Sequence, residues 1–548
     1  MTKKVFIIAI LMAAVIFSPL FAGGGSQQST GGTGSTGVAR TGLPIVDRPI
    51  TIRALSETRN DRTMSNNLRT IQELEKRTNI HIEWEALPTT TADRDAKYHA
   101  IIASGDIPDL IDGMNNAANI NRYGMQGIFL DLKPLINQYA PNITRVFNNP
   151  IQGDEIPYSI NVWGEITAKD GKIYNIPIVS ASNAIGAIWS IRTDWLGKVG
   201  LGIPSTVDQL YTTLKAFKEK NPSGSGKGDE IPFASAQGNR TSTILALVPA
   251  FDAHIGLYVD NADKKIKFGP VEPQFRTALE FLSKIYSEGL IERDYLTATN
   301  DQWLARAGGN MVGLQFVWPG SGLAASNNEL QKINKDFHFE PFPPIKSASG
   351  KQYKDTSVSG AAISHRTSVN AKTKYPVEII RLLDYCFSPE GELLSSWGVE
   401  GETFTMVNGQ PRFNDYIMRN PEGKDPETTQ IHFGIRWNLL PYQNAWAPNF
   451  QSMEPTAPWT VQAWRVYQKP GLVEAPMPTL GLTEDELSRR QTLITEINTY
   501  KDPMIDRFIM GQEPLSNFNT FVAGIQRAGL DELLKILNAA YDVYKANM

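Results

Sequence analysis

Hydrophobic and polar residues alternate with two different periods in the first part of the chain. Over residues 50–54 and 80–84 every second side chain is apolar, as in a strand with one face buried. Over 68–78 the apolar residues recur every three or four positions, which predicts a helix, and another helix is expected over 92–104. A third strand is predicted over 107–111. This β-α-β-α-β order predicts parallel strands joined by right-handed crossovers, with helices covering the sheet.

The rest of the chain continues this alternation. The same periods predict strands over 172–178, 185–191 and 311–316, and an amphipathic helix over 275–285. Further helices are expected from 204, over 376–387 and 388–396, after 483 and after 531. Thr483 and Glu486 have the spacing of a capping box, which marks a helix start. The elements therefore predict an α/β fold in which helices dominate the last third.

The turn after the third predicted strand is a candidate ligand wall. In open α/β sheets, ligands bind beyond the carboxyl ends of the strands. Asp112, Asn115 and Asn116 follow the strand predicted to end at Ile111, so we expect them to face a ligand. The alternative is an ordinary hydrated loop.

The first 44 residues have the pattern of an export signal followed by a tether. Lys3 and Lys4 precede an apolar run over 5–17, and small residues lead to Ala22, which predicts a signal peptide over 1–22. The run is shorter than the roughly 20 residues that a membrane-spanning helix needs. Residues 23–44 are rich in Gly, Ser and Thr, which predicts a flexible tether. Its G-x-G-x-x-G match has no flanking strand or helix, so we discount it.

Composition narrows the function classes. The 548 residues carry a formal net charge of −4, so the chain has no basic field for nucleic acid. Its single cysteine, Cys386, excludes internal disulfides and cysteine-rich metal sites. No cysteine lies near Ala22 for lipid attachment. We therefore expect an exported protein at the periplasmic or extracellular face of the membrane, without a lipidated cysteine.

Several segments, in order along the chain, resemble a known family. They are Thr78–Ile82, Ile102–Asp109, Asp170–Pro177, Ile191–Leu196, Pro389–Gly391 and Trp397–Gly401, followed by the helical region from Leu487 to Tyr544. These segments are similar to those of family 1 extracellular solute-binding proteins of ABC transporters. The resemblance is to the long oligosaccharide-binding branch, which includes alginate-binding proteins.

The resemblance implies a fold and a function. It implies a two-lobed type II periplasmic-binding-protein fold with a ligand cleft between the lobes. By analogy, the N-terminal lobe comprises 45–165 plus 310–370, and the C-terminal lobe comprises 166–309 plus 371–548. It also implies a monomer that captures an oligosaccharide by hinge closure and delivers it to the permease subunits of an ABC importer, without enzymatic activity.

Aromatic residues are the expected sugar platforms, because a sugar ring stacks its C–H face on Trp or Tyr. Trp318 lies in a glycine-containing turn after a predicted strand, where exposure is favoured over core packing. The other candidates are Trp397, Trp437, Tyr442 and Trp446, with Trp459 and Trp464 following closely; core packing is the alternative for each. Trp84, Trp195 and Trp303 fall within strand or helix patterns, and we expect them in the core.

Residues 221–230 have the pattern of a calcium loop. Oxygen-bearing side chains at alternate positions, separated by glycines, suit Ca²⁺. The segment resembles the calcium loop of oligosaccharide-binding relatives, which implies as ligands Asn221, Ser223, Ser225, the Lys227 carbonyl, Asp229 and Glu230. Compared with those relatives, Asn replaces Asp at the first position and Ser replaces Asn at the next two. These replacements remove one negative charge and weaken two ligands, which lowers the expected affinity for Ca²⁺. The loop therefore either binds one structural calcium ion or is a solvated turn.

Other function classes find less support in the sequence. No G-x-S-x-G, H-E-x-x-H or Walker A pattern occurs, and the six histidines are dispersed. Two carboxylates such as Glu400 and Glu402 leave a secreted carbohydrate-active enzyme as an alternative. A binding protein for peptide or another solute is a second alternative. A surface adhesin suits the tether but not the two-lobe pattern.

Overall fold

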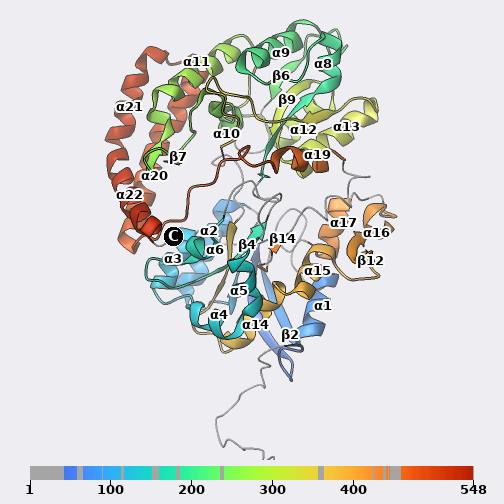
Figure 1. Ribbon diagram of the computed structural model, residues 1–548, viewed down its shortest axis with the longest axis vertical. Coiled ribbons are helices and arrows are strands. Elements are labelled where there is room, and N and C mark those ends of the chain that lie inside the picture. The colour runs from blue at the N-terminus through green and yellow to red at the C-terminus, as the bar shows by residue number, and fades with distance from the viewer. Residues whose placement is uncertain are drawn as a thin grey trace, which may run out of the picture.

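The described residues of this computed structural model form a six-stranded and a four-stranded sheet, and each sheet is the centre of one lobe (Figure 1). Each lobe has its own large apolar core. The structure describes residues 42–57, 66–88, 90–112, 117–150, 160–180, 185–234, 240–355, 363–422, 424, 426–435, 440–441, 443–444 and 458–546. The predicted signal peptide and most of the predicted tether lie outside these ranges. None of the described helices is both long and apolar enough to span a membrane.

The first lobe, below in Figure 1, contains the sheet with strand order β14-β4-β11-β3-β1-β2. Its strands are β1 (Ile50–Glu57), β2 (Ile80–Leu87), β3 (Leu110–Ile111), β4 (Ile176–Ser180), β11 (Ile363–Val369) and β14 (Gln443–Asn444). Its helices are α1 (Arg69–Thr78), α2 (Thr91–Ser104), α3 (Ala117–Met125), α4 (Lys133–Tyr139), α5 (Pro141–Asn148), α6 (Val162–Ile166), α14 (Pro376–Cys386), α15 (Pro389–Trp397), α16 (Asp415–Met418) and α17 (Pro426–Phe433). The hairpin β12 (Phe404–Val407) and β13 (Gln410–Phe413) completes this lobe.

The second lobe, above in Figure 1, contains the sheet with strand order β10-β5-β9-β6. Its strands are β5 (Ile188–Arg192), β6 (Ile231–Ala234), β9 (Val312–Val317) and β10 (Phe339–Pro341), with the hairpin β7 (Leu257–Asp260) and β8 (Lys265–Phe268). Its helices up to residue 333 are α8 (Thr193–Val199), α9 (Val207–Glu219), α10 (Arg240–Leu245), η2 (Val248–Phe251), η3 (Gly269–Val271), α11 (Pro273–Ser287), α12 (Asn300–Gly308), η4 (Pro319–Ala324) and α13 (Ala325–Ile333). The last turns and helices are α19 (Pro458–Tyr467), α20 (Glu484–Ile509), η6 (Leu515–Asn517), α21 (Phe518–Arg527) and α22 (Leu530–Ala546).

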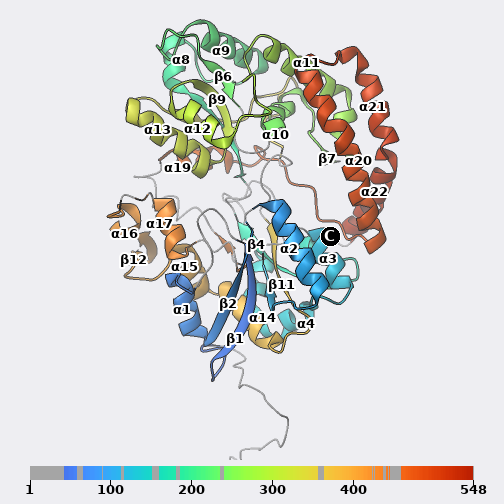
Figure 2. The same cartoon turned by 180° about the vertical axis from the view of Figure 1, so that it is seen from behind.

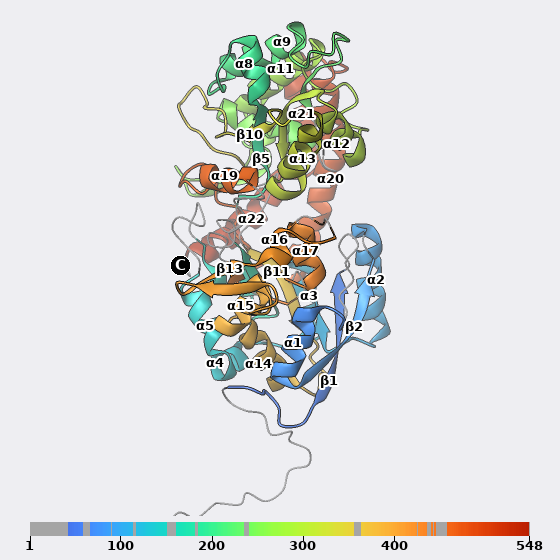
Figure 3. The same cartoon turned by 90° about the vertical axis from the view of Figure 1, so that its right-hand side faces the viewer.

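The chain passes between the lobes through three connections. The first joins β4 to β5, the second joins β10 to β11, and the third joins β14 to α19. α20, α21 and α22 then run along one side of the molecule, and α20 and α22 reach the level of the first lobe (Figures 2 and 3). Contacts of α20 with both α3 and α11 confirm that this helix touches the two lobes.

The predicted secondary structure is largely confirmed. β1 pairs in parallel with β2 and with β3, so the β-α-β-α-β unit has the expected topology. The Thr483 capping box is also present, and Ser388 caps α15 by accepting a hydrogen bond from the Gly391 amide. β3 is shorter than the predicted strand over 107–111, because Pro108 has no N–H to donate to a ladder. The Asp109 carboxylate instead accepts a hydrogen bond from the Arg53 amide at 3.0 Å.

The expected lobe boundaries are corrected by the strand pairing. β9 and β10, expected in the first lobe, pair with β5 in the second. β4, expected in the second lobe, pairs with β11 in the first, and α14 packs on α4 and α5 there. The physical reason is that strand pairing brings together segments far apart in the sequence, and the local pattern of each segment carries no information about its partner.

Candidate functional site

The carboxyl ends of the parallel strands in the first lobe meet at one edge of the sheet. β1, β2 and β3 are mutually parallel, and β11 runs antiparallel to both β3 and β4. β4 and β14 therefore point the same way as β1. Because the chain leaves β4 and β14 for the second lobe, this edge faces that lobe (Figure 1).

The second sheet presents the matching edge. β5 receives the chain from the first lobe, so its amino end faces that lobe. β9 runs antiparallel to β5 and parallel to β6, so the carboxyl ends of β6 and β9 face the first lobe. The residues that follow these strands thus lie at the edge where an α/β sheet binds ligands.

Trp318 lies at this edge, directly after β9. All six residues of β9 are buried, whereas the Trp318 side chain is 37% exposed. Pro319 favours an extended backbone at Trp318, whose carbonyl accepts hydrogen bonds from the Gly322 and Leu323 amides at 3.0 and 2.9 Å. A side chain at Gly322 would clash with Val317, because a Cβ atom there would lie 2.5 Å from the Val317 Cβ. The turn therefore holds an exposed indole at the edge, as a stacking platform requires.

Asp112 lies at the carboxyl end of β3 but does not face solvent. The residue is fully buried, and its Oδ1 accepts a hydrogen bond from the Thr367 hydroxyl of β11 at 3.0 Å. Its backbone carbonyl accepts a hydrogen bond from the Tyr98 hydroxyl. The expectation that Asp112 contacts ligand is corrected. Its carboxylate instead links the end of β3 to β11 inside the lobe.

Trp397 is also placed in the core rather than at the edge. It is 6% exposed and packs against Phe404 and Phe413 of the β12–β13 hairpin, with the Phe413 ring centroid 4.6 Å away. With its ring covered, it cannot stack on a sugar. Trp464 is likewise 6% exposed, and Trp459 is partly buried and stacks on the His338 ring at 4.5 Å.

Trp195 and Trp303 lie in the core as expected, and Trp84 is partly buried. The remaining candidates fall outside the described residues and stay predictions. They are Asn115, Asn116, Trp437, Tyr442 and Trp446.

Direct contacts bridge the lobes beside α20. Lys169 forms an ion pair with Glu486 at 2.7 Å, and the Glu165 carboxylate accepts a hydrogen bond from the Thr479 amide at 2.9 Å. Burial raises the pKa of Glu165. Two cavities of about 340 and 680 Å³ lie between α3 and α20 on this side. A lobe movement that keeps these contacts must pivot here.

Hydrogen bonds between its own residues hold the loop over 221–230 in a tight turn. Gly224, Gly226 and Gly228 have φ values of +75°, +69° and +64°, which let the chain turn tightly. The Asn221 Oδ1 accepts a hydrogen bond from the Gly226 amide at 3.1 Å. The Ser223 hydroxyl donates to Glu230 at 2.6 Å.

The Ser225 hydroxyl donates to Asp229 at 2.7 Å. The side chains expected as metal ligands are therefore linked in two groups, Asn221 with Ser223 and Glu230, and Ser225 with Asp229.

The residues present fit a cation. Glu230 is 2% exposed, and its Oε2 is buried with no hydrogen-bond partner among the described residues. Burying an unpaired carboxylate oxygen is costly, and a bound cation would remove that cost. Asp229 and Glu230 supply two negative charges and the loop supplies further oxygens, which suits Ca²⁺.

A neighbouring asparagine that the sequence analysis did not single out fixes this loop. Asn310, at φ +64° just before β9, donates to the Ser223 carbonyl at 3.0 Å and accepts from the Trp195 indole at 3.3 Å. Lys198 donates to the Pro222 carbonyl at 2.7 Å. An Asn before a buried strand is a turn signal, but only the fold shows that it holds the loop.

Comparison with known proteins agrees with this architecture. Residues 69–393, more than half of the chain, match the family model described as bacterial extracellular solute-binding protein. The chain belongs to this family.

Among relatives of this solute-binding protein is the fructooligosaccharide ABC transporter substrate-binding protein FusA of Streptococcus pneumoniae serotype 4. It is 24% identical over 493 residues, which cover 87% of each chain. The lipoprotein LipO of Bacillus subtilis is 25% identical over 518 residues, covering 90% of this chain and 93% of LipO.

Among solved structures, the alginate-binding protein AlgQ2 without calcium ion has a TM-score of 0.71 at 24% identity. The alignment covers 93% of this chain and all of AlgQ2. This likeness confirms the periplasmic-binding-protein fold. FusA and AlgQ2 are named as binding proteins, in line with the expected function class.

Proposed function

We propose that this chain is the oligosaccharide-binding component of an ABC importer, exported and acting outside the cytoplasm. The observation that carries the proposal is the exposed Trp318, held at the edge where the two sheets face each other. The names of relatives support the ligand class, since FusA is a fructooligosaccharide-binding protein and AlgQ2 binds alginate. The apolar leader over 5–17 supports export.

The sugar binds between the lobes, and the lobes close over it by pivoting beside α20. Trp318 stacks on the apolar face of one sugar ring, while backbone and side-chain polar groups at the facing edges bind hydroxyls. Closure follows because the ligand contacts both lobes in the closed state and one lobe in the open state. The closed chain is then recognised by two permease subunits. We assign no covalent step to this chain, which acts as a monomer.

The loop over 221–230 holds one structural Ca²⁺. Asn221, Ser223, Ser225, the Lys227 carbonyl, Asp229 and Glu230 are its ligands. The unpaired, buried Oε2 of Glu230 supports this assignment. A solved structure of FusA is described as an EF-hand mutant, which supports a metal loop in this family. The ion stabilises the second lobe and takes no part in sugar binding.

Thermal unfolding against a ligand panel tests the proposal. The panel contains kestose, alginate oligosaccharides, human milk oligosaccharides, oligogalacturonides and short peptides. A ligand that binds only the folded chain raises the melting temperature by mass action. We expect a rise with one oligosaccharide class and no release of reducing ends over time. A rise with peptides alone, or the appearance of reducing ends, would contradict the proposal.

A further inference from the structure

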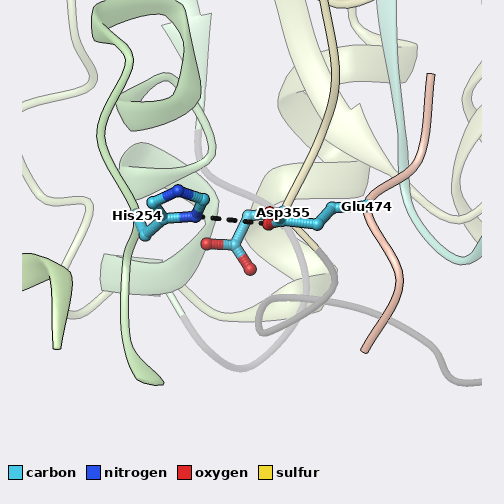
Figure 4. A group of neighbouring side chains, drawn as sticks. All are labelled: His254, Asp355 and Glu474. Atoms are coloured by element: carbon cyan, nitrogen blue, oxygen red, sulfur yellow. Dashed lines mark ion pairs between the residues drawn. The ribbon is translucent and has the colours of Figure 1, made fainter. Parts of the chain in front are cut away.

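Three potential metal ligands from distant parts of the sequence meet in the second lobe. His254 lies between η2 and β7, Asp355 lies on the connection from β10 to β11, and Glu474 lies between α19 and α20. Figure 4 shows that the three side chains point toward one another. One donor atom of each lies within 4.8 Å of the others, and His254 Nδ1 is 3.3 Å from Glu474 Oε2.

The surrounding backbone and rings hold these side chains in place. The segments that carry Asp355 and Glu474 are joined by two hydrogen bonds, from Lys354 N to Leu472 O and from Glu474 N to Lys354 O, both 3.0 Å long. The Asp355 carboxylate accepts a hydrogen bond from the Ile255 amide at 3.0 Å.

The imidazole of His254 is held by a ring contact. The Tyr258 ring stacks on it with 3.5 Å between centroids and an interplanar angle of 10°. The Asp355 carboxylate and the imidazole are therefore oriented before any ligand arrives, as tight metal sites require, and Glu474 is held through its backbone.

His254 and Glu474 form an ion pair whose length also suits two ligands of one metal ion. His254 Nδ1 is buried and has no hydrogen-bond partner among the described residues, although Glu474 Oε2 is close. Zn²⁺ binds imidazole nitrogen and carboxylate oxygen at about 2.0–2.2 Å in a tetrahedron, which places two such donors about 3.4 Å apart. The observed 3.3 Å is the length of one tetrahedral edge.

The charge around the cluster also favours a dication. Asp355 and Glu474 bring two carboxylates to the same place as one imidazole. A divalent cation would balance the two carboxylates that face it.

We infer that His254, Asp355 and Glu474 form a binding site for a divalent transition-metal ion, with Zn²⁺ the best match to one nitrogen and two oxygen donors. A water molecule completes the tetrahedron. This site should select a different ion from the calcium loop, because Ca²⁺ prefers six to eight oxygen ligands and has little affinity for imidazole. The bound ion ties the connection between β10 and β11 to the body of the second lobe.

Calorimetric titration of the untagged chain with Zn²⁺, in saturating calcium, tests this inference. We expect one Zn²⁺ per chain. His254→Gln and Glu474→Gln should each lower the Zn²⁺ affinity at least tenfold, because each removes one of three protein ligands. His338→Gln is the matched control, since His338 also stacks on an aromatic ring and lies 3.0 Å from a glutamate. Its Zn²⁺ affinity should equal that of the wild type.

Cobalt substitution gives a readout that does not depend on variants. Co²⁺ bound to the wild-type chain should show the intense visible absorption of a four-coordinate site, and added Zn²⁺ should abolish it. Absence of Zn²⁺ binding, an unchanged Zn²⁺ affinity in His254→Gln, or the weak spectrum of six-coordinate Co²⁺ would each overturn the inference.

Discussion

Replacing Glu230 by Gln should make the chain more stable than the wild type in chelator and less stable than the wild type in calcium. In the wild type, the buried Glu230 carboxylate accepts one hydrogen bond, from Ser223 at 2.6 Å, and its other oxygen has no partner among the described residues. Calcium would satisfy that oxygen. Glutamine keeps the volume of the side chain and removes the charge that attracts the ion.

The magnitude follows from two opposing contributions. At a calcium concentration of about 100 times Kd, binding stabilises the wild-type fold by about 2.7 kcal/mol, which raises the melting temperature by several degrees. In chelator, the wild type buries a carboxylate whose Oε2 has no hydrogen-bond partner among the described residues, whereas the variant buries a neutral amide, which costs less. We expect Glu230→Gln to be more stable than the wild type in chelator by up to about 1 kcal/mol. In calcium, it should be less stable than the wild type by about 2 kcal/mol.

Thermal unfolding of both proteins in calcium and in chelator measures this reversal. Glu219→Gln is the matched control, because Glu219 ends the neighbouring helix α9 and, among the described residues, forms one exposed ion pair, with Lys215 at 3.6 Å. It should respond to calcium as the wild type does. The reasoning is refuted if calcium leaves the wild type unchanged, or if it stabilises Glu230→Gln as much as the wild type.

Three further predictions concern the edge and the first lobe. Trp318→Ala should weaken oligosaccharide binding by about 1–3 kcal/mol in calorimetry. Its melting temperature should stay nearly unchanged, because Trp318 is 37% exposed. Unchanged affinity would remove Trp318 from the site. Burial raises the pKa of Glu392 to about 7, which means that the folded chain favours the protonated side chain. The resulting contribution to the free energy of unfolding is fully present below the ordinary pKa of Glu and is lost as the pH rises through about 7. Glu392→Gln should therefore raise the free energy of unfolding in urea by about 1–2 kcal/mol at pH 8 and by little at pH 5; an equal gain at both would contradict this. Burial also raises the pKa of the Cys386 thiol, so a thiol reagent should label it only in denaturant, and rapid labelling of the native chain would show that the first lobe opens.

Local patterns predicted the elements of this fold well because secondary structure depends on neighbouring residues. The 50–54 alternation corresponds to β1, and Thr483 with Glu486 caps α20 through both expected hydrogen bonds. The lobe boundaries were wrong because they depend on which strands pair. β9 follows β5 by more than a hundred residues, yet the two are neighbours in one sheet.

The same distinction explains which site residues could be predicted. The ligands expected in the calcium loop lie within ten consecutive residues, so their spacing was visible in the sequence. Asp112 was expected to face ligand, but the antiparallel β11 brings Thr367 onto its carboxylate. Trp397 was a candidate platform with core packing as the alternative, and the structure shows the core position, because the β12–β13 hairpin covers its ring. The cluster of His254, Asp355 and Glu474 spans more than two hundred residues, and only the fold brings it together.

Hydrogen–deuterium exchange, with and without the oligosaccharide that most stabilises the chain, tests the central claim most directly. A sugar held between the lobes should slow amide exchange in the turn 318–324 and at the carboxyl ends of β1, β3 and β4. Exchange in the loop over 221–230 should not change. Protection confined to regions away from the facing edges, or none at saturating sugar, would contradict the account.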